Sequence, residues 1–184
     1  VYHEVFKWIS PVVKQYDLSI INFETTLGGK PYKGYPQFSA PDSYAYDLKQ
    51  AGFNFFVQAN NHAVDRYNKG IFRTIEKLDE FGIPHTGTFR NKDERDSNYP
   101  VMLGVKGVKI AMLNCTFSTN GIKPKSPAIV NMVDKEEIKA DLKKAREKNP
   151  DLIMMVIHWG AEYKNYPNSY QKNIANFLIF SYLN

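Results

Sequence analysis

Short apolar runs alternate along the chain with stretches in which apolar residues recur every three or four positions. Short runs are typical of buried strands, and the longer spacing is typical of helices. The runs predict strands in DLSIINFE (residues 17–24), FNFFVQA (53–59) and DLIMMVIHWG (151–160). Two further runs, YPVMLGV (99–105) and VKIAMLNC (108–115), flank Lys106 and Gly107. This arrangement predicts a hairpin.

The helical spacing predicts helices over about 2–16, 42–51, 68–81 and 134–148, and a last one from Ser169 onward. Pro11 disturbs the first of these. Gly52 and Gly82 follow the second and third, and glycine commonly ends helices. Asp134, followed by Glu137, has the sequence of a capping box. Strands that alternate with helices predict a layered α/β fold, and the hairpin argues against a purely parallel sheet.

Composition favours a single globular domain over residues 1–184. The chain has 184 residues and 43% apolar content, enough to bury a sizeable core. The net charge is +5, but basic residues are spread among acids, and the cluster KKAREK (143–148) is typical of a solvated helix face. Such a charge attracts acidic partners in general, and nucleic acid is not indicated. The single Cys115 excludes an internal disulfide framework.

Both ends of the chain lie inside amphipathic patterns, so we expect a fragment of a larger protein. The sequence has no uninterrupted apolar run of about 18 residues and no signal-peptide pattern at its start. Unpaired strand edges and an apolar terminal helix face, with Phe177, Leu178 and Phe180, predict a dimer through these truncated edges.

Polar residues follow three of the predicted strands. Each has an ordinary structural explanation alone, because asparagine often turns the chain and histidine often hydrogen-bonds within the fold. Ligands, however, bind at the carboxyl ends of strands in open α/β sheets. Carboxylate, amide and imidazole groups together bind divalent metals such as Mn, Fe or Zn. The residues at these strand ends are Asn22, Glu24, Asn60, Asn61, His62, His158 and Glu162.

Several segments in order carry a family resemblance: NFETTLGG (22–29), FSAPDSYAYDLKQAGFN (38–54), ANNHAVDRYNKG (59–70), TIEKLDEFGIPHTGT (74–88) and VIHWGAEY (156–163). They resemble the motifs of CapA-type poly-γ-glutamate and capsule-synthesis proteins, a branch similar to calcineurin-like metallophosphoesterases. The resemblance covers essentially the whole chain. It implies a metallophosphoesterase-like αββα sandwich with mixed sheets and a two-metal pocket at the strand ends.

The resemblance also implies roles for individual residues. Glu24 matches the bridging carboxylate ligand, Asn61 an amide-oxygen ligand and His158 an imidazole ligand. His62 lies beside the pocket as a general acid or phosphate contact. The remaining matches are expected to orient ligands or contact substrate; they are Asn22, Asn60, Asp65 and Glu162.

The implied cofactors are two divalent ions (Mn, Fe, Zn or Mg), which would clamp an anionic group and activate a water molecule. The family pattern opens with a Gly-Asp strand and closes with a Gly-His-His-Pro-His-like stretch, and this chain has neither. We therefore expect the fragment to bind metal poorly and to be inactive. The turn after Asp65 also carries more residues before Gly70 than the family usually has.

The resemblance implies a protein at the cell surface, membrane-anchored in its full-length form, that works with the capsule-synthesis machinery on an anionic polymer or a phosphorylated substrate. One alternative is a non-catalytic surface module that holds or exports an anionic polymer, with contacts from the tyrosine-rich loop 31–46. A second alternative is a purely structural assembly subunit. Metal-dependent turnover would distinguish the enzyme from both.

Overall fold

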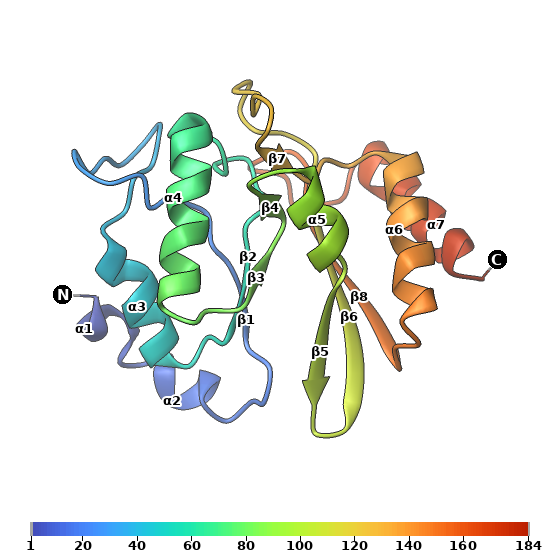
Figure 1. Cartoon of the computed structure of the whole chain (residues 1–184), viewed down its shortest axis with the longest axis horizontal. Helices are drawn as coiled ribbons and strands as arrows, with labels where there is room; N and C mark the ends of the chain where they lie inside the picture. Colours follow the sequence, from blue (N-terminus) through green and yellow to red (C-terminus); the bar gives the residue numbers. More distant parts are fainter. Residues whose placement is uncertain (1, 184) are drawn as a thin grey trace.

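Two β-sheets pack face to face between outer helices in the computed structural model, which describes residues 2–183 (Figure 1). One sheet and its helices come from the first half of the chain, and the other sheet and its helices come from the second half. The layers run helix, sheet, sheet, helix. This arrangement confirms the predicted α/β class with mixed sheets.

The first sheet is parallel and contains β1 (Ile20–Asn22), β2 (Phe55–Val57) and β3 (His85–Thr86), in that order. Ile21 lies opposite Phe56, and Phe56 lies opposite His85. Strands β1 and β2 are shorter than their apolar runs. Strand β3 was not predicted from the sequence, because two residues leave no periodic pattern.

The second sheet contains β5 (Val101–Val105), β6 (Val108–Thr116) and β8 (Leu152–His158). The predicted hairpin is confirmed, because β5 and β6 pair antiparallel around Lys106 and Gly107, with φ of 47° and 87°. Strand β8 runs parallel to β6 and places His158 opposite Thr116. A third, small sheet pairs β4 (Thr88–Phe89) with β7 (Ile129–Val130).

Helices α3 (Asp42–Ala51) and α4 (Tyr67–Glu80) pack on the first sheet, and α6 (Lys135–Glu147) and α7 (Ser169–Leu183) pack on the second. Helix α5 (Lys92–Asn98) precedes β5. The predicted first helix over 2–16 is wrong, because the structure has two short helices, α1 (His3–Phe6) and α2 (Ser10–Val13). Pro11 lies in the first turn of α2, where its missing N–H costs nothing.

The helix ends follow local chemistry closely. Gly52 has φ of 114° and ends α3, as predicted. The Asp134 carboxylate accepts hydrogen bonds from the N–H groups of Glu136 and Glu137 and begins α6. The reciprocal half of the predicted capping box is absent, because the Asp134 N–H donates to the Met132 carbonyl instead. The cap therefore acts through one side chain.

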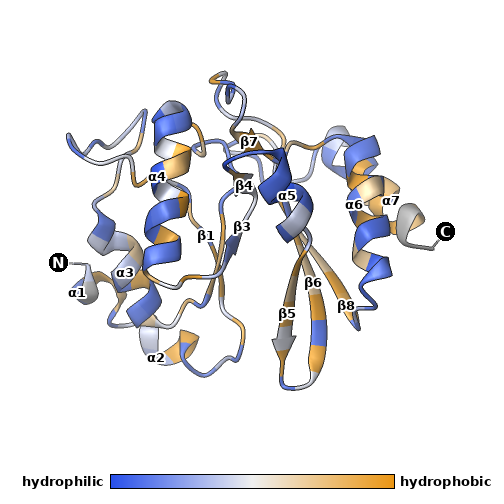
Figure 2. Cartoon of the chain, in the orientation of Figure 1, coloured by the Kyte–Doolittle hydropathy of each residue, from blue (hydrophilic) through white to orange (hydrophobic). Residues whose placement is uncertain are grey.

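Apolar side chains fill the space between the two sheets and beneath each helical layer. Phe55 and Val57 of the first sheet meet Met112 of the second in the centre of the sandwich, and all three are fully buried. Each such side chain contributes about 1.5–3 kcal/mol by leaving water. Figure 2 shows the matching pattern, with β6 and β8 mainly hydrophobic and hydrophilic turns along α4 and α6. The packed sheets hold their strand ends in fixed positions.

Candidate functional site

Two strand ends from different sheets meet at Asn22, the last residue of β1. The Asn22 Nδ2 atom lies 2.8 Å from the Glu24 Oε2 atom and 3.4 Å from the His158 Nδ1 atom. His158 ends β8 in the second sheet. These residues therefore do not all leave strands of one sheet. Face-to-face packing brings the carboxyl ends of β1 and β8 together instead.

Glu24 and His158 form an accessible acid and imidazole pair at this junction. The His158 Nε2 atom lies 3.9 Å from the Glu24 Oε1 atom. The two side chains are 40% exposed for Glu24 and 27% for His158, so a ligand can reach both. The His158 Nδ1 atom faces Asn22, and the Nε2 atom faces the carboxylate.

Asn60 attaches the segment after β2 to the end of β1. Its Nδ2 group donates to the Asn22 Oδ1 atom at 3.1 Å and to the Phe23 carbonyl at 3.0 Å. Its Oδ1 atom accepts from the His62 N–H at 3.0 Å. Asn60 is fully buried, so these bonds are made away from water and position both Asn22 and His62.

Asn61 presents a buried oxygen that lacks a partner. Within the described residues its Oδ1 atom accepts no hydrogen bond, whereas its Nδ2 atom lies 3.4 Å from the Asn120 Oδ1 atom. An unsatisfied buried acceptor costs about 1–3 kcal/mol and calls for an explanation. An amide oxygen held free in this way is a suitable ligand for a divalent cation.

His62 is held in one orientation by two neighbours. Its Nδ1 atom lies 2.7 Å from the Asp65 Oδ2 atom, and the Phe38 ring centroid lies 4.4 Å from the imidazole centroid. Asp65 also accepts a 2.6 Å hydrogen bond from the Phe38 N–H. Since Nδ1 faces the carboxylate, Nε2 is the atom left for a substrate.

Glu162 lies exposed in the segment between β8 and α7. The structure shows no hydrogen bond or ion pair between Glu162 and any other described residue. Its expected contribution to the site stays a prediction.

The donor set suits a metal that prefers oxygen and imidazole ligands. Among the described residues, no group of three or more His, Cys, Asp or Glu side chains is arranged for a metal ion. The available donors are the Glu24 carboxylate, the His158 imidazole and the unpaired Asn61 oxygen. These groups fit Mn, Fe, Zn or Mg chemistry and exclude a thiolate site, since Cys115 is buried in the core.

Asn114, near the end of β6, was missed from the sequence although it joins the two sheets near the site. Its Oδ1 atom accepts from the Ala59 N–H at 2.7 Å, and its Nδ2 group donates to the Val156 carbonyl at 3.1 Å. Ala59 precedes Asn60, and Val156 precedes His158 by two residues. An asparagine inside the apolar run AMLNCTF (111–117) was the signal that could have found it.

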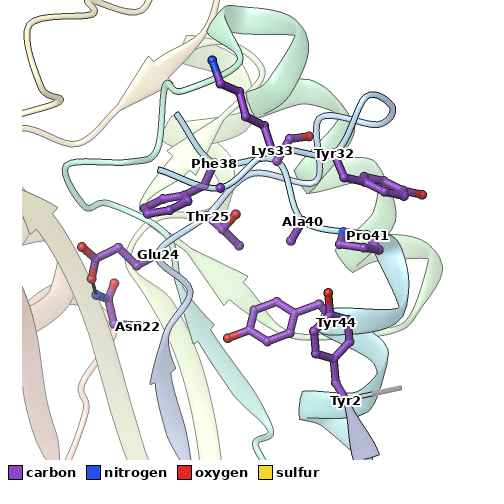
Figure 3. Close-up of a pocket in the computed structure, with 12 residues that line it drawn as sticks. Tyr2, Asn22, Glu24, Thr25, Tyr32, Lys33, Phe38, Ala40, Pro41 and Tyr44 are labelled. Atoms are coloured by element: carbon purple, nitrogen blue, oxygen red, sulfur yellow. Dashed lines mark hydrogen bonds between the residues drawn. The ribbon is translucent and has the colours of Figure 1, made fainter. Parts of the chain in front are cut away.

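An open pocket of about 570 Å³ continues from Asn22 and Glu24 towards α3 (Figure 3). The loop after β1 forms one wall, and α3 forms another. Of the candidate ligands, Glu24 thus lies at one end of a larger cavity, beside Asn22.

No helix in the described part of the chain is both long and apolar enough to cross a bilayer.

Comparisons with known proteins agree with the motifs. The model of the family described as bacterial capsule synthesis protein PGA_cap matches residues 1–181. The capsule biosynthesis protein CapA of Bacillus anthracis is 29% identical over 187 residues, which cover 95% of this chain and 45% of that protein. The PGA biosynthesis protein CapA of Bacillus subtilis (strain 168) is 25% identical over 181 residues, with coverages of 95% and 47%.

The chain therefore spans about half the length of these curated relatives. The family model covers nearly all of the chain, and the resemblance seen in the motifs is confirmed. On this evidence, the chain belongs to the bacterial capsule synthesis family PGA_cap.

Proposed function

We propose that the protein acts in capsule biosynthesis as a metal-dependent hydrolase of the phosphoesterase type. The observation that carries this proposal is the junction at Asn22, where one amide contacts both the Glu24 carboxylate and the His158 imidazole. Family membership and the names of the two CapA relatives support the capsule role. The surface location, the anionic polymer or phosphorylated substrate and the capsule-synthesis partners belong to the same proposal.

Three groups would hold metal in this site: the Glu24 carboxylate, the His158 imidazole through Nε2, and the Asn61 amide oxygen. A pair of divalent ions supplies a hydroxide nucleophile near neutral pH and charge for an anionic substrate group. Asn22 orients Glu24 and His158 together, because it contacts both side chains. Asn60 in turn holds Asn22 in place.

His62 would exchange a proton with the leaving oxygen through Nε2. The Asp65 carboxylate holds Nδ1 and fixes the ring orientation, and the Phe38 ring packs against the imidazole. General acid or base help of this kind contributes about 10²- to 10⁴-fold to a rate. Because Asp65 orients the ring, loss of its carboxylate should slow turnover through His62.

Four variants of the intact protein test the proposal through metal content and phosphoester turnover measured together. Glu24→Gln and His158→Ala should lose both metal and activity, because each removes a ligand. His62→Asn should keep its metal and slow turnover by about 10²- to 10⁴-fold. Glu162→Gln should fall between, at about 10- to 100-fold. His85→Asn is the matched control, because His85 bonds to the Ile83 carbonyl outside the site.

Full metal and full activity in Glu24→Gln, His158→Ala and His62→Asn would contradict the proposal. The strand-end residues would then be structural. That result would favour the alternative, a non-catalytic module that binds an anionic polymer. Polymer binding that a chelator leaves unchanged would support this alternative further.

A further inference from the structure

Most of the wall of the 570 Å³ pocket lies outside the groups assigned to metal and proton transfer. A cavity of this size is large enough for a small organic ligand. Four aromatic side chains line it: Tyr2, Tyr32, Phe38 and Tyr44. They come from the start of the chain, the loop after β1 and helix α3 (Figure 3).

Three of the four aromatic side chains, Tyr2, Phe38 and Tyr44, pack against other rings. The Tyr44 ring centroid lies 5.0 Å from that of Tyr2 and 5.9 Å from that of buried Phe23. Phe38 packs against His62, and its N–H donates to Asp65. Side chains that are already fixed lose little conformational freedom when a ligand binds. These side chains therefore need little rearrangement when a ligand binds.

The loop that carries Phe38 is also fixed along its backbone. Lys33 and Ser39 exchange two backbone hydrogen bonds of 3.1 and 2.8 Å. Thr26 accepts from the Ala40 N–H and donates its hydroxyl to the Phe38 carbonyl, both at 2.8 Å. These bonds hold the loop over the pocket opposite α3.

The charges and hydroxyls of the lining indicate the ligand. Among the described residues of the lining, Lys33 is the one cation and Glu24 the one carboxylate, so the formal charges of these two side chains cancel. The Tyr44 hydroxyl points towards Asn22 and Glu24 (Figure 3) and has no hydrogen-bond partner among the described residues. Burial, with a smaller effect from Tyr2, raises the pKa of Tyr44, so this hydroxyl stays neutral and can both donate and accept.

We propose that this pocket binds a neutral sugar ring. The C–H groups on one face of a sugar ring pack on aromatic faces, whose π-electrons carry partial negative charge. The hydroxyl groups around the edge of the sugar ring can form hydrogen bonds with tyrosine hydroxyls. A polyanion fits less well, because it would meet a single lysine and the opposing charge of Glu24. The inference goes beyond the proposed function, because sugar binding requires neither bound metal nor turnover.

The test measures binding of three neutral disaccharides, maltose, cellobiose and lactose, to the intact protein in the presence of EDTA. Saturation-transfer NMR detects binding, and calorimetry measures the affinity, which we expect near the millimolar range for at least one of them. Because the chelator removes metal, failure of the metal proposal leaves this result unchanged.

Two variants and a control assign the binding to the pocket. Tyr44→Phe keeps the ring packing and should weaken binding about 3- to 10-fold through the lost hydrogen bond. Tyr32→Ala should also weaken binding, and Tyr32 is 46% exposed, so the fold should tolerate the change. Tyr46→Phe is the control, because Tyr46 is also on α3 but packs on Phe81, outside the pocket.

Absence of binding for all three disaccharides at about 10 mM would overturn the proposal. So would disaccharide binding that both Tyr44→Phe and Tyr32→Ala leave unchanged. Binding of polyglutamate in EDTA without binding of any disaccharide would likewise overturn it.

Discussion

Asn114→Ala should lower the free energy of unfolding by more than the loss of one hydrogen bond would, because Asn114 joins the two sheets beside the site. The Ala59 N–H donates to the Asn114 Oδ1 atom and would become a buried donor without a partner. This loss costs about 1–3 kcal/mol. The lost hydrogen bond to the Val156 carbonyl adds about 0.5–1.5 kcal/mol. We expect the free energy of unfolding to fall by about 1.5–4.5 kcal/mol in total.

Urea unfolding followed by circular dichroism measures this change, with the denaturant slope compared between variants. Asn91→Ala is the matched control, because Asn91 is exposed and caps α5 through one hydrogen bond to the Glu94 N–H. That loss should cost about 1 kcal/mol. If Asn114→Ala costs no more than Asn91→Ala, the buried link does not hold the sheets together and the reasoning is wrong.

Three further changes test other parts of the structure. Gly87→Ala should destabilise by more than about 2 kcal/mol in urea unfolding, because φ is 106° and a Cβ would lie 2.0 Å from the Asn114 Oδ1 atom. Asp134→Ala should lower the unfolding free energy by about 1 kcal/mol through the lost α6 cap; no change would show that the cap is dispensable. The Arg73 hydrogen bond and charge lower the pKa of Asp42, so this pair stabilises the fold above the usual carboxyl pKa of 3.8 and loses its effect as pH falls through the lowered value. Stability curves between about pH 5 and pH 2 should therefore fall more steeply for the natural protein than for Asp42→Asn.

Features that depend on neighbouring residues could be predicted from the sequence. Gly52 ends α3, and the pair Lys106 and Gly107 forms the hairpin turn, because each needs only a local backbone conformation. The capping box was half right, since the Asp134 side chain caps α6 without help from the side chain of Glu137. Local chemistry thus located most of the long elements.

The pairing of the strands could not be predicted in the same way. Nothing near His158 in the sequence shows that β8 belongs to a different sheet from β1, because pairing depends on residues far apart in the chain. The role of Asn114 could not be predicted for the same reason, since its partners Ala59 and Val156 are distant in sequence. The sequence could therefore propose the residues of the site, but the junction between sheets required the structure.

The most direct test of the metal site is a Mn²⁺ titration of the intact protein, monitored by electron paramagnetic resonance, for the natural sequence, Glu24→Gln and Asn61→Leu. We expect about two bound ions per chain in the natural protein. We also expect clear loss of binding in Glu24→Gln and in Asn61→Leu, which lacks the free amide oxygen. Equal Mn²⁺ binding by all three proteins, or no binding by the natural protein, would contradict the central claim that these strand ends form a metal site.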